Sequence, residues 1–396
     1  NFYNIHGIIN TETQFFKSSV GTSSARIKVN PSNIFVGDTI WKVKPSDIIY
    51  GTNNLTIDHF SIEHNKQHLI VSGLATKNPS DSLFVDIKDV DVSYILNLVN
   101  FHSVSFSGLA TGRAYISNLF DKPQSAAKLL VNKFKFQNGR MGVLTANVNY
   151  NNTAEQIDIN AIANDGPGSQ TLINGYVSPK HNYIDLDIKA QNSRVEFVES
   201  FCSSFMHNID AYGNGEIILS GPLNSMNLIG RIIVDGSAGI SSLNTNYKLK
   251  NDTIDFIHNE IQFKKDKLYD KNGNLGVVSG SIYHQNLKKL TYNIKLEAND
   301  MLAYDFHEFG TNTFYGTIYA TGSCNIRGKS GEISIDINAK PEKGSQLVYN
   351  VSSPETIRNN EFIRWNNADK PGSINSARNN SNADIPSDIH LNFLIN

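Results

Sequence analysis

The sequence predicts a mainly β protein, built as an elongated and repetitive antiparallel sheet with one short amphipathic helix in each repeat of about 103 residues. Three observations predict this fold class. Apolar and polar residues alternate with a period of two, the joints between alternating runs are rich in Asn and Gly, and two glycine markers recur at a constant spacing. Such alternation is typical of antiparallel strands with one apolar and one solvated face.

The strands are predicted from runs such as "YIDLDIKA" at 183–190, which places three aliphatic residues on one side of the strand and three charged residues on the other. Residues 157–163, 290–298 and 332–339 alternate in the same way. The joints "NNTAEQ", "NDGPGSQ" and "YDKNGNLG" contain residues that tolerate positive φ angles. We therefore expect a meander on the order of 30 strands, with about eleven residues for each strand and turn.

The repeat is predicted from two glycine markers that keep step through three copies. The first marker is Gly73, Gly175 and Gly280, at intervals of 102 and 105 residues, and the second is Gly112, Gly215 and Gly322, which follow the first by 39, 40 and 42 residues. This predicts repeat units at 73–174 and 175–279, with a partial first repeat at 1–72 and a partial unit at 280–353.

Each repeat contains one helix-like patch between its two markers. We expect helices at 92–99, 194–206 and 300–307, lying against the apolar side of the sheet, because apolar residues there recur at spacings of three and four. Ser193 is a candidate N-cap.

The final part of the chain departs from the pattern. Residues 354–386 are rich in Asn, Ser and Pro and predict a long loop, and a new strand region begins at 387–396. The chain begins and stops inside strand-like runs, so we expect it to be a segment of a longer protein.

Composition excludes several function classes. A net charge of -2 with 18% charged residues lacks the Lys and Arg excess that nucleic-acid binding requires. The two cysteines, Cys202 and Cys324, are too few for a disulfide scaffold and lack zinc-site spacing, so we expect small buried apolar residues. No run approaches the 18 apolar residues of a membrane-spanning helix.

No catalytic, cofactor-binding or metal-ligating residues are predicted, and we expect no enzyme. His64 and His68 would lie about 13 Å apart in one extended run, too far to share a metal. Asp270 begins "DKNGN", which lacks the later Glu of a calcium loop and favours a hairpin turn. Neither a nucleophile elbow nor a phosphate-binding loop is present.

Three blocks of sequence occur in order: "GEIILSGPLNSMNLIGRIIVDG" from 215, "YDKNGNLGVVSGSIYHQNLKKLTYNIKLEAND" from 269 and "NTFYGTIYATGSCNIRGKSGEISIDINA" from 312. Together they resemble TamB-type translocation and assembly proteins of the AsmA-like superfamily. The run "WKVKPSDIIY" at 41–50 looks like the version found in Bacteroidota. The resemblance implies a periplasmic protein whose sheet curls into an open apolar groove, a β-taco. It also implies phospholipid transport between the inner and outer membranes, outer-membrane biogenesis and protein assembly.

The resemblance further implies an inner-membrane anchor in a missing N-terminal region and a TamA-like barrel of the BamA superfamily as partner of a missing C-terminal region. Within this chain it implies that phospholipid acyl chains lie along one apolar side of the sheet. The expected groove lining is Ile157, Ile159, Ile184, Leu186, Ile188, Ile217, Leu219, Ile232, Val234, Ile294, Leu296, Ile333, Ile335 and Ile337.

Two other classes of protein were weighed. A structural or adhesive β-repeat protein would close its apolar faces on each other and bind no ligand. An enzyme on a β-helix would repeat every 20 to 30 residues, and this chain does not.

Overall fold

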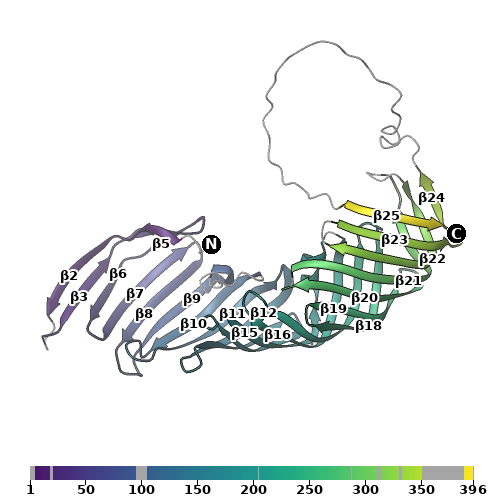
Figure 1. Cartoon of the computed structure of the whole chain (residues 1–396). Helices are drawn as coiled ribbons and strands as arrows, with labels where there is room; N and C mark the ends of the chain where they lie inside the picture. Colours follow the sequence, from purple (N-terminus) through teal and green to yellow (C-terminus); the bar gives the residue numbers. More distant parts are fainter. Residues whose placement is uncertain are drawn as a thin grey trace, which may run out of the picture.

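The computed structural model describes residues 5–17, 21–94, 105–203, 205–286, 288–309, 314–329, 332–349 and 388–395. These residues form one sheet of 25 strands that does not close on itself. In Figure 1 the sheet twists along its length, from the N-terminal strands in purple to a strongly curved C-terminal half in green. The fold is therefore mainly β, as the sequence predicts.

The strands and helices have the following bounds. The first seven strands are β1 (Ile5–Ile8), β2 (Thr11–Lys17), β3 (Ser23–Val29), β4 (Ser32–Val36), β5 (Thr39–Val43), β6 (Ser46–Gly51) and β7 (Asn54–His64). They are followed by β8 (Gln67–Ala75), β9 (Ser82–Asp91), β10 (Phe106–Ser117), β11 (Gln124–Phe136), β12 (Gly139–Asn151), β13 (Gln156–Asn164), β14 (Gln170–Ser178) and β15 (Tyr183–Arg194). After the short helices η1 (Glu196–Val198) and α2 (Glu199–Cys202) come β16 (Met206–Pro222), β17 (Asn227–Ile240), β18 (Thr245–Ile257), β19 (Glu260–Tyr269), β20 (Leu275–Gln285), β21 (Lys288–Phe306), β22 (Phe314–Lys329), β23 (Glu332–Pro341), β24 (Gln346–Tyr349) and β25 (Asp388–Ile395).

The topology is a meander. From β7 to β23 every strand pairs with the next one in the chain, always antiparallel. At the N-terminal end β7 pairs with both β6 and β5, and the sheet continues as two branches, β6–β3–β2 and β5–β4–β1. The last strand, β25, runs parallel to β23.

The long strands bend at β-bulges, which explain the curl of the sheet. Within the described strands, nine residues other than Gly have a positive φ where the pairing register shifts: His59, Asp89, Lys133, Asn192, Asn208, Asn251, Lys265, Lys289 and Asp300. A bulge adds an unpaired residue to one strand, which bends the strand and increases its twist. Because such residues lie on strands throughout the sheet, the whole sheet curves.

Three of these bulges are held by a side chain on the following strand. The backbone N–H of Asp89 donates to Thr111 Oγ1 at 3.1 Å, that of Asn192 to Asn214 Oδ1 at 2.8 Å, and that of Asp300 to Thr321 Oγ1 at 2.9 Å. The three acceptors immediately precede the second glycine marker. The recurring sequence therefore encodes a polar acceptor for a bulge, followed by a glycine.

Both glycine markers occupy crowded places beside the backbone of the next strand. A Cβ atom on Gly112, Gly215 or Gly322 would lie 2.0–2.3 Å from a backbone carbonyl oxygen, and one on Gly73, Gly175 or Gly280 would lie 2.0–2.4 Å from one. The repeated positions are thus physically equivalent. The unit boundaries at 73, 175 and 280 stay a prediction, because the sheet passes through them without interruption.

The predicted helices have different outcomes. Within 194–206 the structure contains η1 and α2, although Val195, and not Ser193, is the N-cap residue of η1. Residues 92–94 are helical, and the rest of 92–99 lies outside the described residues. The prediction at 300–307 is wrong, because β21 continues to Phe306.

The error at 300–307 has a physical cause. The pairing of β21 with β22 shifts twice, between Ala298 and Met301 and again between Leu302 and Tyr304. Each shift interrupts the period of two, so the buried residues Met301, Leu302 and Tyr304 acquire a spacing that resembles a helix. One helix in each repeat is therefore not a feature of this fold. The predicted loop at 354–386 also lies outside the described residues.

Replacing Thr321 by Val is expected to lower the free energy of unfolding by about 0.5 to 1 kcal/mol, because it removes the exposed hydrogen bond that Thr321 accepts from the N–H of the Asp300 bulge. Urea unfolding followed by circular dichroism measures the loss. Thr145→Val, at an exposed position on β12, is the control. Equal effects of the two substitutions would contradict a role for Thr321 in holding the bulge.

Candidate functional site

The candidate site is one face of the sheet. Cross-strand pairing aligns Ile159 with Gly175, Gly175 with Leu186, and Leu186 with Leu219. We call the face that carries these residues the apolar face. Pairing extends it to β23 without a change of side, and it includes all fourteen residues expected to line a groove: Ile157, Ile159, Ile184, Leu186, Ile188, Ile217, Leu219, Ile232, Val234, Ile294, Leu296, Ile333, Ile335 and Ile337.

Burial along the apolar face is uneven. Five of the fourteen residues are buried, namely Ile184, Ile232, Val234, Ile333 and Ile335, and the other nine are half-buried. At the N-terminal end of the same face the apolar side chains are open to solvent, with Phe15 82% and Tyr50 53% exposed. The face is thus uncovered at one end and largely covered at the other.

The opposite face is mostly polar. Cross-strand ion pairs lie on it, such as Arg113 with Asp86 at 2.7 Å and Lys189 with Glu216 at 3.0 Å. In both pairs the hydrogen-bonded partner holds the pKa of the basic group above its usual value. Some aliphatic side chains are exposed there too, including Ile218 at 47%. The chemistry of the two faces is nevertheless clearly different.

Three clusters of buried residues lie along the apolar face. The first is centred on Ala110 and Val131, the second on Ile232 and Val234, and the third on Tyr292 with the isoleucines of β23. A single uninterrupted core would not divide in this way. The division indicates separate stretches of covered apolar surface along one sheet.

The second cluster is covered by described residues 195–203 and Phe205, between β15 and β16, which we call the connector. Its Phe197 lies 5.1 Å from Phe136 at the end of β11, measured between ring centroids. At the other end Phe205 lies 5.3 Å from Tyr292 on β21 and packs against both the second and third clusters. Cys202, between them, is buried in the second cluster. The connector therefore reaches from β11 to β21 over the apolar face.

Polar contacts fix the start of the connector. Asp165, at the tip of the β13–β14 hairpin, accepts hydrogen bonds from Arg140 and Arg194, both at 2.7 Å. Arg194 also donates to Glu196 at 2.9 Å. Glu199 accepts a hydrogen bond from the backbone N–H of Ile209 at 3.2 Å. These bonds tie η1 to β15 and α2 to β16, and Asp165 ties β15 to the β13–β14 hairpin and to β12.

Two carboxylates interrupt the apolar face beside the second cluster. Pairing places Asp252 opposite Val234 and Asp266 opposite Val278, all on the apolar face. Asp266 is 4% exposed, and its Oδ2 has no hydrogen-bond partner within the described residues. Burial, helped by the negative charge of Asp252, raises the pKa of Asp266 to about 6. This site had no signal in the sequence, because Asp occurs throughout the strands.

The two cysteines also lie on the apolar side. Cys202 is buried and Cys324 is half-buried. Burial raises the pKa of Cys202 to about 12 and that of Cys324 to about 11. A thiol with such a pKa is almost entirely protonated at neutral pH and reacts slowly.

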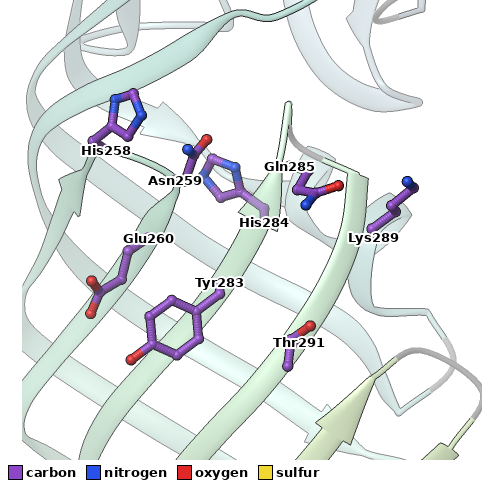
Figure 2. Close-up of a pocket in the computed structure, with 8 residues that line it drawn as sticks. All are labelled: His258, Asn259, Glu260, Tyr283, His284, Gln285, Lys289 and Thr291. Carbon is purple, nitrogen blue, oxygen red and sulfur yellow. The ribbon is translucent and has the colours of Figure 1, made fainter.

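A shallow depression of about 670 Å³ lies at the turns that join β18 to β19 and β20 to β21. Figure 2 shows its lining side chains spread along neighbouring strands and not converging on one point. The lining residues are His258, Asn259, Glu260, Tyr283, His284, Gln285, Lys289 and Thr291. Burial, with the nearby His258, lowers the pKa of His284. The arrangement does not suggest a reaction.

The other candidates from the sequence are structural. His64 and His68 lie on the two strands of the β7–β8 hairpin, and not on one extended run as expected, and alternate pairing places them on opposite faces. Asp270 accepts hydrogen bonds from the N–H groups of Asn272 and Asn274, both at 2.8 Å, in the turn between β19 and β20. Across the described ranges, no three metal-ligating side chains lie together.

None of the helices that the structure describes is long and apolar enough to cross a membrane. Comparison with family models, with curated proteins and with solved structures finds no match to this chain.

Proposed function

We propose that this chain is part of a TamB-type protein and that its apolar face carries phospholipid acyl chains through the periplasm, between the inner and outer membranes. The observation that supports this most is the continuity of the apolar face, which runs through every strand from β7 to β23 of an unclosed sheet. In this proposal the fourteen aliphatic residues named above line the lipid path, and the sheet serves outer-membrane biogenesis.

The size and chemistry of the face suit an acyl chain. Strands about 4.8 Å apart make the stretch from β7 to β23 about 80 Å long along the sheet. Each CH₂ group that leaves water for an apolar surface contributes about 0.8 kcal/mol. Half-buried aliphatic side chains such as Leu186 and Ile294 still offer surface to such a ligand. A lipid could therefore move along the face without returning its acyl chains to water.

The exposed N-terminal end of the face supports the same proposal. Ile5, Phe15 and Tyr50 are each more than half exposed and lie on the apolar face. Contiguous exposed apolar residues are characteristic of interaction sites. We place the TamA-like barrel partner and the inner-membrane anchor in regions outside this chain, and we assign the chain no enzymatic activity.

A second candidate function is a structural or adhesive β-repeat protein with a closed apolar core. The observation that favours it is the burial of the three clusters, in the first of which Ala163 and Val131 are only 1% and 2% exposed. In this case the apolar face would be filled by the chain itself and would bind no lipid.

Site-specific photo-crosslinking separates the two candidates. A photoreactive phenylalanine analogue replaces Tyr50 on the apolar face, and in the control protein Ile218 on the opposite face, which is about equally exposed. Each protein is illuminated with vesicles of phosphatidylethanolamine and phosphatidylglycerol. We expect lipid adducts at position 50 and at most a trace at 218. An absence of adducts at both positions would favour the closed structural protein, and equal adducts at both would indicate nonspecific contact.

A further inference from the structure

We infer that the surface beneath the connector is an acyl-chain site, and that the connector occupies it as a removable plug. This inference rests on the proposed function. It adds the place along the sheet at which the lipid path is interrupted. The connector places Cys202 and Phe205 on the apolar face, in contact with the second and third clusters. Those two side chains take the space through which an acyl chain would pass from the N-terminal half of the sheet to β21.

The surface beneath the plug has the chemistry of an acyl-chain site. Around Cys202 the second cluster consists of Ile209, Ala211, Ile232 and Val234, with only apolar atoms in their side chains. Beyond it, Tyr292 is 3% exposed, and its hydroxyl has no hydrogen-bond partner among the described residues. An apolar chain can replace Cys202 and Phe205 there without breaking a side-chain hydrogen bond of the sheet.

The connector itself is suited to leave. Its helices η1 and α2 have three and four residues, far shorter than a helix that is stable alone, so docking is what keeps them folded. Val198, Ser200 and Ser203 are exposed on its outer side. Displacement of the connector costs its contacts with Phe136, Tyr292 and the second cluster, together with the hydrogen bonds from Arg194 to Glu196 and from the Ile209 N–H to Glu199, but it breaks no strand pairing.

The third repeat shows that the fold does not need a plug at this position. Residues 300–306, which correspond to the connector by their distance from the glycine markers, extend β21 and pair with β22. The sheet is therefore complete with or without a helical segment there. A segment that the architecture does not require is available for control of access.

Gly139 provides a way to loosen the plug without altering the apolar surface beneath it. A Cβ atom at this position would lie 2.3 Å from the backbone N of Phe197, and the φ of Gly139 is not positive, so Ala is accommodated only if the connector moves. Gly51→Ala is the matched control, because its Cβ would have one close contact, the Oγ of Ser24 at 2.8 Å, and would not touch the connector. Phe205→Ala is a second loosening variant, which removes the contact with Tyr292.

Thiol labelling reports directly on the plug. We expect Cys202 to react with a thiol reagent about tenfold faster in Gly139→Ala than in the native protein, since overpacking of about 1.4 kcal/mol shifts an equilibrium tenfold. Cys324 on β22 is the internal control, and its rate is expected to stay constant. Gly51→Ala is expected to leave both rates unchanged. If neither Gly139→Ala nor Phe205→Ala speeds the labelling of Cys202, the connector is a fixed part of the core and the inference is wrong.

Photo-crosslinking then tests the acyl-chain site. The photoreactive residue is placed at Tyr50, before the plug, or at Ile294, beyond it on β21, with the same phospholipid vesicles. In the native sequence we expect adducts at 50 and few at 294, and in Gly139→Ala or Phe205→Ala we expect adducts at both. Equal adducts at 294 with and without loosening would overturn the plug while leaving the lipid path intact. An absence of adducts at 50 in every protein would instead overturn the proposed function.

Discussion

Replacing Gly175 by Ala is expected to lower the free energy of unfolding by about 4 kcal/mol. The backbone at Gly175 has a φ of 142°, which residues with a Cβ rarely adopt, and the strain costs about 1 to 3 kcal/mol. The new Cβ would also lie 2.0 Å from the carbonyl oxygen of Asp185, which adds overpacking of about 1 to 3 kcal/mol. Because Asp185 belongs to a paired strand, it cannot move away without breaking the ladder.

Gly168→Ala separates the two causes. Gly168 also has a positive φ, 75°, but a Cβ there would meet nothing within 4 Å. We expect it to cost about 1 kcal/mol, from backbone strain alone. Urea unfolding curves of both variants give the comparison. A loss at Gly175 no greater than the loss at Gly168 would contradict the argument that close strand approach selects glycine at the first marker.

These glycines explain why the repeat could be found in the sequence. A position at which any Cβ collides with a neighbouring carbonyl accepts only glycine, so a repeated backbone geometry leaves a repeated letter. Alternation with a period of two similarly indicates which residues lie on the apolar face, because pairing in register keeps these residues on one side of the sheet through many strands. The fourteen aliphatic residues could be placed on one side of the sheet for this reason. That they bind lipid stays a prediction.

The remaining features depend on contacts that sequence periodicity does not encode. A bulge such as that at Asp300 shifts the alternation and imitated a helix. The contact of Phe205 with Tyr292 joins residues far apart in the chain, and the phenylalanines of the connector predicted only a helix there. The low exposure of Asp266, 4%, is a property of the folded sheet and has no counterpart in the local sequence. Each of these is a tertiary effect on a local pattern.

The bulges also relate the fold to the proposed function. A flat sheet would expose its apolar face along its whole length and would be prone to stack against a second sheet. Bending at Asp89, Asn192 and Asp300 curls the sheet around its own apolar side, and Thr111, Asn214 and Thr321 fix three of those bends. In the proposed function, this curl would shield the face from other proteins and leave a path for a narrow apolar ligand.

Replacing Asp266 by Asn is expected to stabilise the chain at pH 7 by about 3 kcal/mol and to change little at pH 4. The pKa of Asp266 is raised from 3.8 to about 6 in the folded chain, first by burial and then by the charge of Asp252. The folded state therefore binds the proton more tightly than the unfolded state. The resulting stabilisation is fully present below pH 4 and is lost as the pH rises through 6, and two pKa units correspond to about 3 kcal/mol.

The charges near Asp266 support an upward shift of its pKa in the folded chain. Asp252 and Asp255 both raise its pKa, and the ammonium group of Lys264 is engaged by Asp255 at 2.9 Å. Urea unfolding of the native chain and of Asp266→Asn is measured from pH 4 to pH 7, and the difference between the two is plotted against pH, so that other titrating groups cancel. We expect the difference to grow from pH 4 to about pH 6 and to level off by pH 7. Asp121→Asn, on an exposed turn, is the control for loss of a carboxylate away from the apolar face. A flat difference for Asp266→Asn would show that the carboxylate is solvated, and that the apolar face is open to water at β19.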